Sequence, residues 1–191
     1  MCNNFSVDSS LPNAYIKIKN YLLKELSPII NKRPIIILCI GTDRSTGDSL
    51  GPLVGYKLKR LSVVNIYIYG TLENPVHAKN LRNVLNKINH YFSDPYIIAI
   101  DSCLGSINNI GKIFIKKGPL APGLALNKDL PSIGDMNITG IVNISGNFQF
   151  FVLQNTRLYT VMNLADSISR GIYYFSLENK DSITDNIISF Q

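Results

Sequence analysis

Residues 34–55, PIIILCIGTDRSTGDSLGPLVG, decide the fold of this chain. The stretch opens on an apolar run that ends at Gly41, continues through a polar loop, and reaches the pair Gly51 and Pro52. An apolar run, a loop and a helix start in this order are typical of a buried parallel strand that leads into a helix. Ligands and reacting groups collect at the carboxyl edge of such sheets, so we expect Asp48 to lie at a functional edge.

A second stretch repeats this design. Residues 95–105, PYIIAIDSCLG, form an apolar run that we expect to be a strand ending at Asp101. Each carboxylate has a structural alternative, because Asp48 can serve as a helix cap and Asp101 can hold neighbouring loop amides. Two such residues on consecutive strand–helix units nevertheless favour a functional pair at one edge of the sheet.

Paired carboxylates support two kinds of chemistry. They can share a proton, so that one acts as base for an attacking water and the other as acid. Alternatively, they can coordinate a divalent metal that activates the water. The sequence alone leaves both open.

Further polar residues are candidates for contacting a substrate at the same edge. The loop before the helix lacks the lysine of a phosphate-binding loop and the spacing of a dinucleotide fingerprint, and its acidic residues disfavour an anion site. The connector 71–80 follows the second predicted strand and should lie over the same edge, where it supplies a possible third polar group. The substrate-binding candidates are Gly41, Thr42, Asp43, Arg44, Glu73, His77 and Ser102.

Composition describes one ordinary globular domain. The chain has 191 residues, of which 46% are hydrophobic and 17% charged. The net charge of +6 comes from scattered lysines and arginines without a nucleic-acid motif, so we expect no nucleic-acid partner. We also expect no membrane association, because no apolar run approaches the ~18–20 residues of a membrane span and the amino terminus does not resemble a secretory signal. Three scattered cysteines favour a reducing compartment, and we expect a cytoplasmic protein.

Hydrophobic periodicity predicts an α/β protein in which helices separate parallel strands. We expect the first 13 residues to be a flexible tail, residues 118–139 to be a long loop near the site, and the chain from residue 178 to fray. The predicted helices are 14–26, 48–61, 75–91, 147–155 and 156–175, and the predicted strands are 35–40, 63–69, 96–100, 112–116 and 140–145.

Several motifs in the same order carry a family resemblance. They are GTDRSTGDSLGPLVG, TLENPVHAKNL, AIDSCLG, GPLAPG and TGIVNISG, and the match as a whole runs from about residue 34 to residue 165. Together they closely resemble the YyaC-type sporulation proteins of endospore-forming Firmicutes. That family is distantly similar to the germination protease of spores and to the hydrogenase maturation endopeptidases.

The resemblance implies a fold, a pair of catalytic residues and no cofactor. The implied fold has three layers, α/β/α, with a mostly parallel, phosphorylase/hydrolase-like sheet. The proposed catalytic aspartates of the germination protease match Asp48 and Asp101, while the loop 118–139 is similar to one that could shape a substrate groove. In the hydrogenase peptidases a histidine joins the acidic pair to hold nickel. No histidine follows His90 here, so we expect no metal or other cofactor, and a divalent metal at the two aspartates is the less favoured alternative.

The implied function is an aspartate-dependent peptidase of the sporulating cell or forespore, acting on a peptide or small protein. The main alternative is a non-catalytic sporulation factor that uses the same cleft to bind a peptide or protein partner. A hydrolase of small molecules is a weaker third hypothesis. The sequence sets no oligomeric state.

Overall fold

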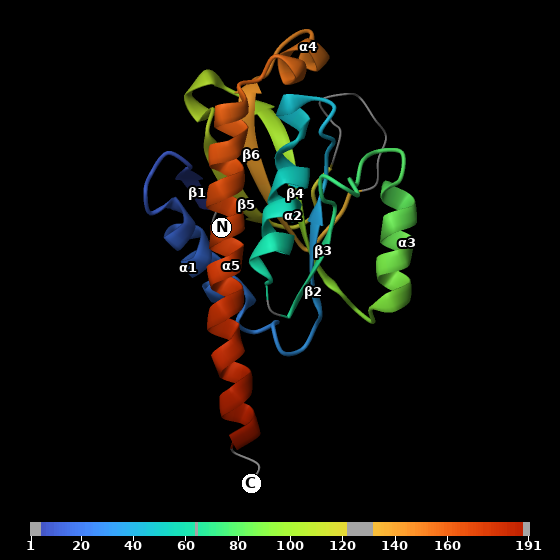
Figure 1. The fold of residues 1–191 in the computed structure, drawn as a ribbon, viewed down its shortest axis with the longest axis vertical. Helices are drawn as coiled ribbons and strands as arrows, with labels where there is room; N and C mark the ends of the chain where they lie inside the picture. The colour runs from blue at the N-terminus through green and yellow to red at the C-terminus, as the bar shows by residue number, and fades with distance from the viewer. Residues whose placement is uncertain (1–4, 64, 122–131, 189–191) are drawn as a thin grey trace.

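The fold is built on one mixed sheet, which a computed structural model describes over residues 5–63, 65–121 and 132–188. Within these residues the strand order is β1-β5-β6-β4-β2-β3, and β5 alone runs against the others (Figure 1). This confirms the predicted α/β class with a mostly parallel sheet. The strands are β1 (Phe5–Asp8), β2 (Ile35–Cys39), β3 (Ile66–Tyr69), β4 (Tyr96–Gly105), β5 (Lys112–Lys117) and β6 (Met136–Ile144).

Helices cover both faces of the sheet and make it the middle of three layers. The larger apolar core lies between one face and α1, α2 and α5, and the smaller core lies under α3 on the opposite face (Figure 1). Alternation along the strands divides the side chains between the two cores, because successive residues point to opposite faces. The helices are α1 (Ala14–Leu26), α2 (Leu50–Leu61), α3 (Leu81–Tyr91), α4 (Gln149–Gln154) and α5 (Leu158–Ile188), with short 3-10 helices η1 (Thr46–Asp48) and η2 (Ile107–Asn109).

Both ends of the chain contain regular secondary structure that the sequence did not predict. The segment expected to be a flexible tail contains β1, which pairs with β5 and buries Val7. At the other end α5 continues to Ile188 instead of fraying from residue 178, and it runs through Gly171, where the close approach of Ile18 leaves no room for a Cβ.

Three internal boundaries differ most from expectation. Helix α3 starts at Leu81 and not at residue 75, because Asn80 closes the preceding turn by accepting a hydrogen bond from His77 N and donating one to Pro75 O. The strand β4 continues to Gly105, and β6 begins at Met136 inside the segment predicted to be a loop. Part of that predicted loop, residues 122–131, lies outside the described residues.

Among the described residues, none of the helices combines the length and the hydropathy that a membrane span requires.

Candidate functional site

Asp101 lies inside strand β4, not at its end as the sequence suggested. Strand β2 ends at Cys39, which pairs with Ile100, so Asp101 is the first β4 residue beyond the end of β2. On its other side it pairs with Thr139 of β6. The side chain of Asp101 points to the face that carries α3, because Ile100 belongs to the core on the opposite face. Because β2 ends before it reaches Asp101, there is space beside the buried carboxyl group of Asp101.

The loop after β2 turns back and brings Asp48 into this space. Thr42 N donates a hydrogen bond to Asp48 O at 3.0 Å, and η1 ends at Asp48. Gly41 makes the turn possible, since its φ is +139° and a Cβ there would lie 2.0 Å from Asp48 O. The glycine therefore positions the backbone that carries Asp48.

Asp48 and Asp101 line one pocket of ≈ 540 Å³ at the carboxyl edge of the sheet. Its floor includes polar residues from neighbouring strands, since Asn137 and Thr139 of β6 and Lys116 of β5 line it as well. The remaining lining residues are Ser102, Cys103, Leu104, Pro119, Leu120, Ala121, Ser145, Gln149 and Leu153.

The electrostatics of the pocket favour a protonated Asp101. Its side chain is only 7% exposed. Burial raises the pKa of Asp101 well above its usual range and the charge of Asp48 raises it further, while a hydrogen bond from Ser102 N acts in the opposite direction. A buried carboxyl group with a raised pKa beside a second carboxyl group is the arrangement expected of an acid–base pair.

Cys103 shares the pocket but is not activated as a nucleophile. Burial, and then the neighbouring Asp101, raise the pKa of Cys103 to about 12, against a smaller lowering by Lys116. The thiol therefore keeps its proton near neutral pH, whereas nucleophilic cysteines need a lowered pKa.

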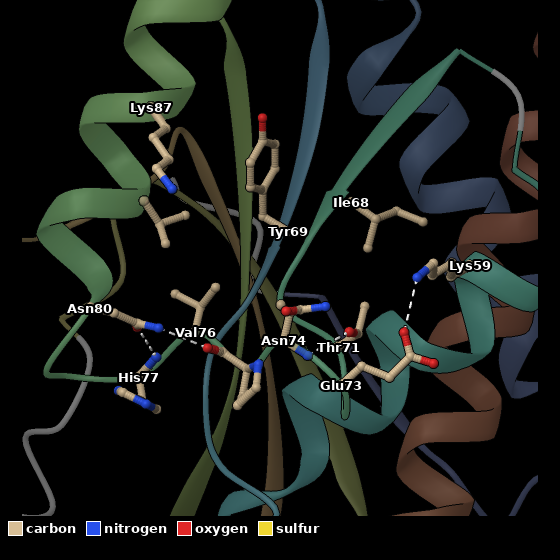
Figure 2. Close-up of a pocket in the computed structure, with 13 residues that line it drawn as sticks. Lys59, Ile68, Tyr69, Thr71, Glu73, Asn74, Val76, His77, Asn80 and Lys87 are labelled. Carbon is tan, nitrogen blue, oxygen red and sulfur yellow. Dashed lines mark hydrogen bonds and ion pairs between the residues drawn. The ribbon is translucent and has the colours of Figure 1, made fainter.

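Glu73 and His77 line a different pocket, of ≈ 480 Å³, between α2 and α3. Figure 2 shows His77 beside Asn80 on the side of α3, while Glu73 turns toward α2 and forms an ion pair with Lys59 at 3.1 Å. The structure therefore does not bring Glu73 and His77 together with the aspartates, as the sequence predicted, but places them in a separate pocket.

Of the other substrate-binding candidates, one lines the aspartate pocket and the rest do not. Ser102 lines the aspartate pocket, whereas Gly41, Thr42, Asp43 and Arg44 are not among its lining residues. Asp43 and Arg44 are exposed, and Thr42 Oγ1 accepts a hydrogen bond from Arg44 N within the loop.

Sequence reasoning missed the polar residues that β5, β6 and α4 contribute to the pocket. Asn137 and Thr139 lie in the segment that the sequence predicts to be a loop, although MNIT alternates apolar and polar residues as a half-buried strand does. Gln149 lies in a predicted helix, and no motif in the sequence indicates a role for it. Within the described residues, no group of three or more His, Cys, Asp and Glu side chains is arranged to hold a metal ion.

The fold and the pocket define an α/β protein with an acidic site at the carboxyl edge of a mixed sheet. Residues 6–171 match the family described as "Protein of unknown function (DUF1256)", and the chain belongs to this family. It is 52% identical over 140 residues to the "Uncharacterized protein YyaC" of Bacillus subtilis (strain 168). The matched residues cover 73% of this chain and 68% of the relative.

A solved structure shares the fold at much lower identity. The [NiFe] hydrogenase maturation protease HycI from Thermococcus kodakarensis KOD1 superposes with a TM-score of 0.55 at 17% identity, over 79% of this chain and 97% of that one. The similarity shows a common α/β architecture, because identity this low does not transfer an activity.

Proposed function

We propose that this protein is a peptidase in which Asp48 and Asp101 hydrolyse a peptide bond of a peptide or small protein. The observation that carries the proposal is the placement of both carboxyl groups in one pocket at the carboxyl edge of the sheet. The fold shared with a maturation protease and the motif resemblance to the germination protease of spores support the same class of reaction.

The two carboxyl groups take different parts in the reaction. Asp48 accepts a proton from water, whose oxygen attacks the carbonyl carbon of the peptide. Asp101 keeps its own proton because burial and the charge of Asp48 raise its pKa, and it donates that proton to the departing nitrogen. One water is consumed, and the products are a new carboxyl terminus and a new amine.

Other lining residues can stabilise the oxygen that becomes negative during the attack. Lys116 brings a positive charge to the pocket, and Thr139 brings a hydroxyl group beside Asp101. Donors that are already in place when charge develops contribute strongly to such reactions. The proposed reaction needs no cofactor, and a divalent metal held by the two aspartates is the alternative.

The proposed setting is the cytoplasm of the sporulating cell or forespore. The motif resemblance to sporulation proteins supports it, together with the 52% identical relative in Bacillus subtilis.

Cleavage of a peptide library tests the proposal. The full chain is incubated with peptides prepared from the proteome of sporulating Bacillus subtilis, and new termini are identified by mass spectrometry. We expect Asp48→Asn and Asp101→Asn each to lower the cleavage rate by at least about 100-fold, since each removes a proton-transfer group. A parallel reaction with a chelator should proceed unchanged if no metal is needed.

Asp94→Asn is the matched control. Asp94 lies on the surface, paired with Arg33, and its φ of 49° suits asparagine. Full activity in both pocket variants would refute the proposal. Peptides that bind without being cut would favour the non-catalytic sporulation factor instead.

A further inference from the structure

Strand β3 leaves one edge of the sheet open. It is the last strand in the order, and within the described residues its backbone pairs only with β2. Every second residue of a parallel strand directs its N–H and C=O groups to its partner, so the alternate groups of β3 point away from β2. Another extended backbone matches the spacing of these groups, and an open edge is a template for an added strand.

The open edge lies in the pocket of ≈ 480 Å³ between α2 and α3. Ile68 and Tyr69 of β3 line this pocket from opposite faces of the sheet, since Ile68 packs with the larger core and Tyr69 with the smaller one. Figure 2 shows Lys59 of α2 and Lys87 of α3 on either side of them. The two helices therefore form the walls of a groove, the β3 groove, in which an extended chain can lie beside β3.

Most of the net positive charge of the chain belongs to the elements that form this groove. Residues 50–91 comprise α2, β3 and α3, and they include six Lys and Arg residues but a single acidic residue, Glu73. The six basic residues are Lys57, Lys59, Arg60, Lys79, Arg82 and Lys87.

The single acidic residue does not neutralise both lysines of the groove. Glu73 is paired with Lys59 at 3.1 Å. Lys87 is exposed and has no ion pair among the described residues. An occupant with acidic side chains therefore finds an unpaired cation beside the open backbone groups of β3.

We propose that the β3 groove binds an extended, acidic segment of another protein as an added strand. The backbone of the segment pairs with the open groups of β3, and an acidic side chain on the α3 side forms an ion pair with Lys87. The proposal is independent of the peptidase activity, because neither Asp48 nor Asp101 lines this pocket.

Two other occupants fit these observations less well. A second copy of this chain, paired edge to edge by twofold symmetry, would bring the same basic residues of both copies together. A single-stranded nucleic acid has the right charge but lacks N–H and C=O groups at the spacing of a strand. Lysines beside an open edge discourage basic partners, so the same residues select an acidic strand.

Fluorescence anisotropy with three labelled peptides of equal length tests the proposal on the full chain. Their centres read Glu-Val-Glu-Thr-Glu, Lys-Val-Lys-Thr-Lys, and the first of these with its backbone nitrogens methylated. Methylation removes the N–H groups and keeps the charge. We expect the unmethylated acidic peptide to bind at least about tenfold more tightly than either of the others, because it alone supplies both the charge and the donors.

Lys87→Glu should weaken binding of the acidic peptide by at least about tenfold, because it places a like charge in the groove. Lys24→Glu is the matched control, since it makes the same change of charge at an exposed position on α1, which does not line the groove. At physiological salt we expect this control to change the affinity by less than about twofold.

Hydrogen exchange followed by mass spectrometry locates the bound peptide. The acidic peptide should slow exchange in a fragment that contains residues 66–71 and leave a fragment from β1 unchanged. Repeating the binding with Asp48→Asn and Asp101→Asn in one chain should give the same affinity, so a failed cleavage test would leave this proposal standing.

Several outcomes would overturn the proposal. They are equal affinity for the three peptides, no measurable binding of the acidic one, the same loss in the Lys24 variant, and unchanged exchange in β3. Displacement of the acidic peptide by an equal concentration of oligothymidylate would indicate a nucleic-acid site instead. Exchange in β3 that slows with protein concentration alone would show that a second copy covers the edge.

Discussion

Asp101 is a buried acid that weakens the fold it belongs to. Its carboxyl group lies in a strand that is apolar up to Ile100, and both burial and the charge of Asp48 oppose its ionisation. The unfolded chain carries no such penalty, so its Asp101 loses a proton at a lower pH than the folded chain does. The folded state therefore binds more protons in the window between the two pKa values.

This difference predicts how stability depends on pH. Since the folded pKa of Asp101 is raised, its contribution to the free energy of unfolding falls as pH increases from the unfolded pKa of ~3.9 through the raised folded value. Asp101→Asn removes the ionisable group and keeps an acceptor for Ser102 N. At neutral pH we expect this variant to raise Tm by at least about 2–4 °C, the shift that 1 kcal/mol produces in a chain of this size.

Thermal unfolding followed by circular dichroism, at several values between pH 4 and 8, measures both effects. The difference in Tm between variant and unsubstituted chain should shrink toward acid pH, where Asp101 is protonated in both states. Asp94→Asn, on the surface, should show no such trend. An Asp101 variant that is less stable at neutral pH would contradict the account.

At this scale the sequence located the two aspartates but not the reason they meet. The motif around each residue indicated a carboxyl edge, and Asp48 and Asp101 do share a pocket. The placement of Asp101 inside a strand was not predictable, because it depends on how far β6 extends as a partner. The positions of Glu73 and His77 were not predictable from the sequence either, because the turn that Asn80 closes decides where they lie.

Among the elements, α2 packs very closely against the backbone that follows β3. A Cβ at Gly55 would lie 1.8 Å from Gly70 O, which follows β3. The clash would be with backbone, which cannot move aside as a flexible side chain can. The missing Cβ therefore sets the distance between α2 and the sheet.

Gly55→Ala should destabilise the chain although alanine favours helices. Intrinsic propensity alone predicts a gain of roughly 0.5–1 kcal/mol in a helix interior. We expect a loss of at least about 2–3 kcal/mol in the free energy of unfolding, because α2 must shift from the sheet. Urea denaturation measures the change. Gly146→Ala is the control, since nothing lies within 4 Å of a Cβ there, and it should stay within about 0.5 kcal/mol of the unsubstituted chain.

Elements with a strong period were predictable, and those that depend on distant partners were not. Helix α1 has the predicted bounds 14–26, because its apolar residues repeat at helical spacing along the whole helix. The start of β6 was missed because the prolines and glycines that precede it indicate a loop, while Asn137 and Thr139 face a pocket instead of a core. These residues form a strand because β6 pairs with β4, although the sequence around them indicates a loop.

For the whole molecule, β1 closes one edge of the sheet. It covers β5, whose backbone groups would otherwise be open to another chain. Val7 is 5% exposed, and the ring of Phe5 lies 4.6 Å from that of Tyr21 on α1. The residues FSVD alternate between apolar and polar as a half-buried strand does, but four residues so far from β5 in sequence do not indicate which strand they pair with.

Deleting residues 1–8 should lower stability and expose β5. Fully burying a side chain such as Val7 stabilises by about 1.5–3 kcal/mol, and Phe5 is partly buried, so we expect a loss of roughly 2–4 kcal/mol in the free energy of unfolding by urea denaturation. Light scattering should also show association that grows with protein concentration, because an uncovered edge strand pairs with other chains. Ser6→Ala, on the exposed side of β1, should change neither property, whereas Val7→Ala should reproduce part of the loss. A truncated chain with unchanged stability would mean that β1 lies on the sheet without supporting it. In that case β5 would be stable as the edge strand of the sheet without β1 beside it.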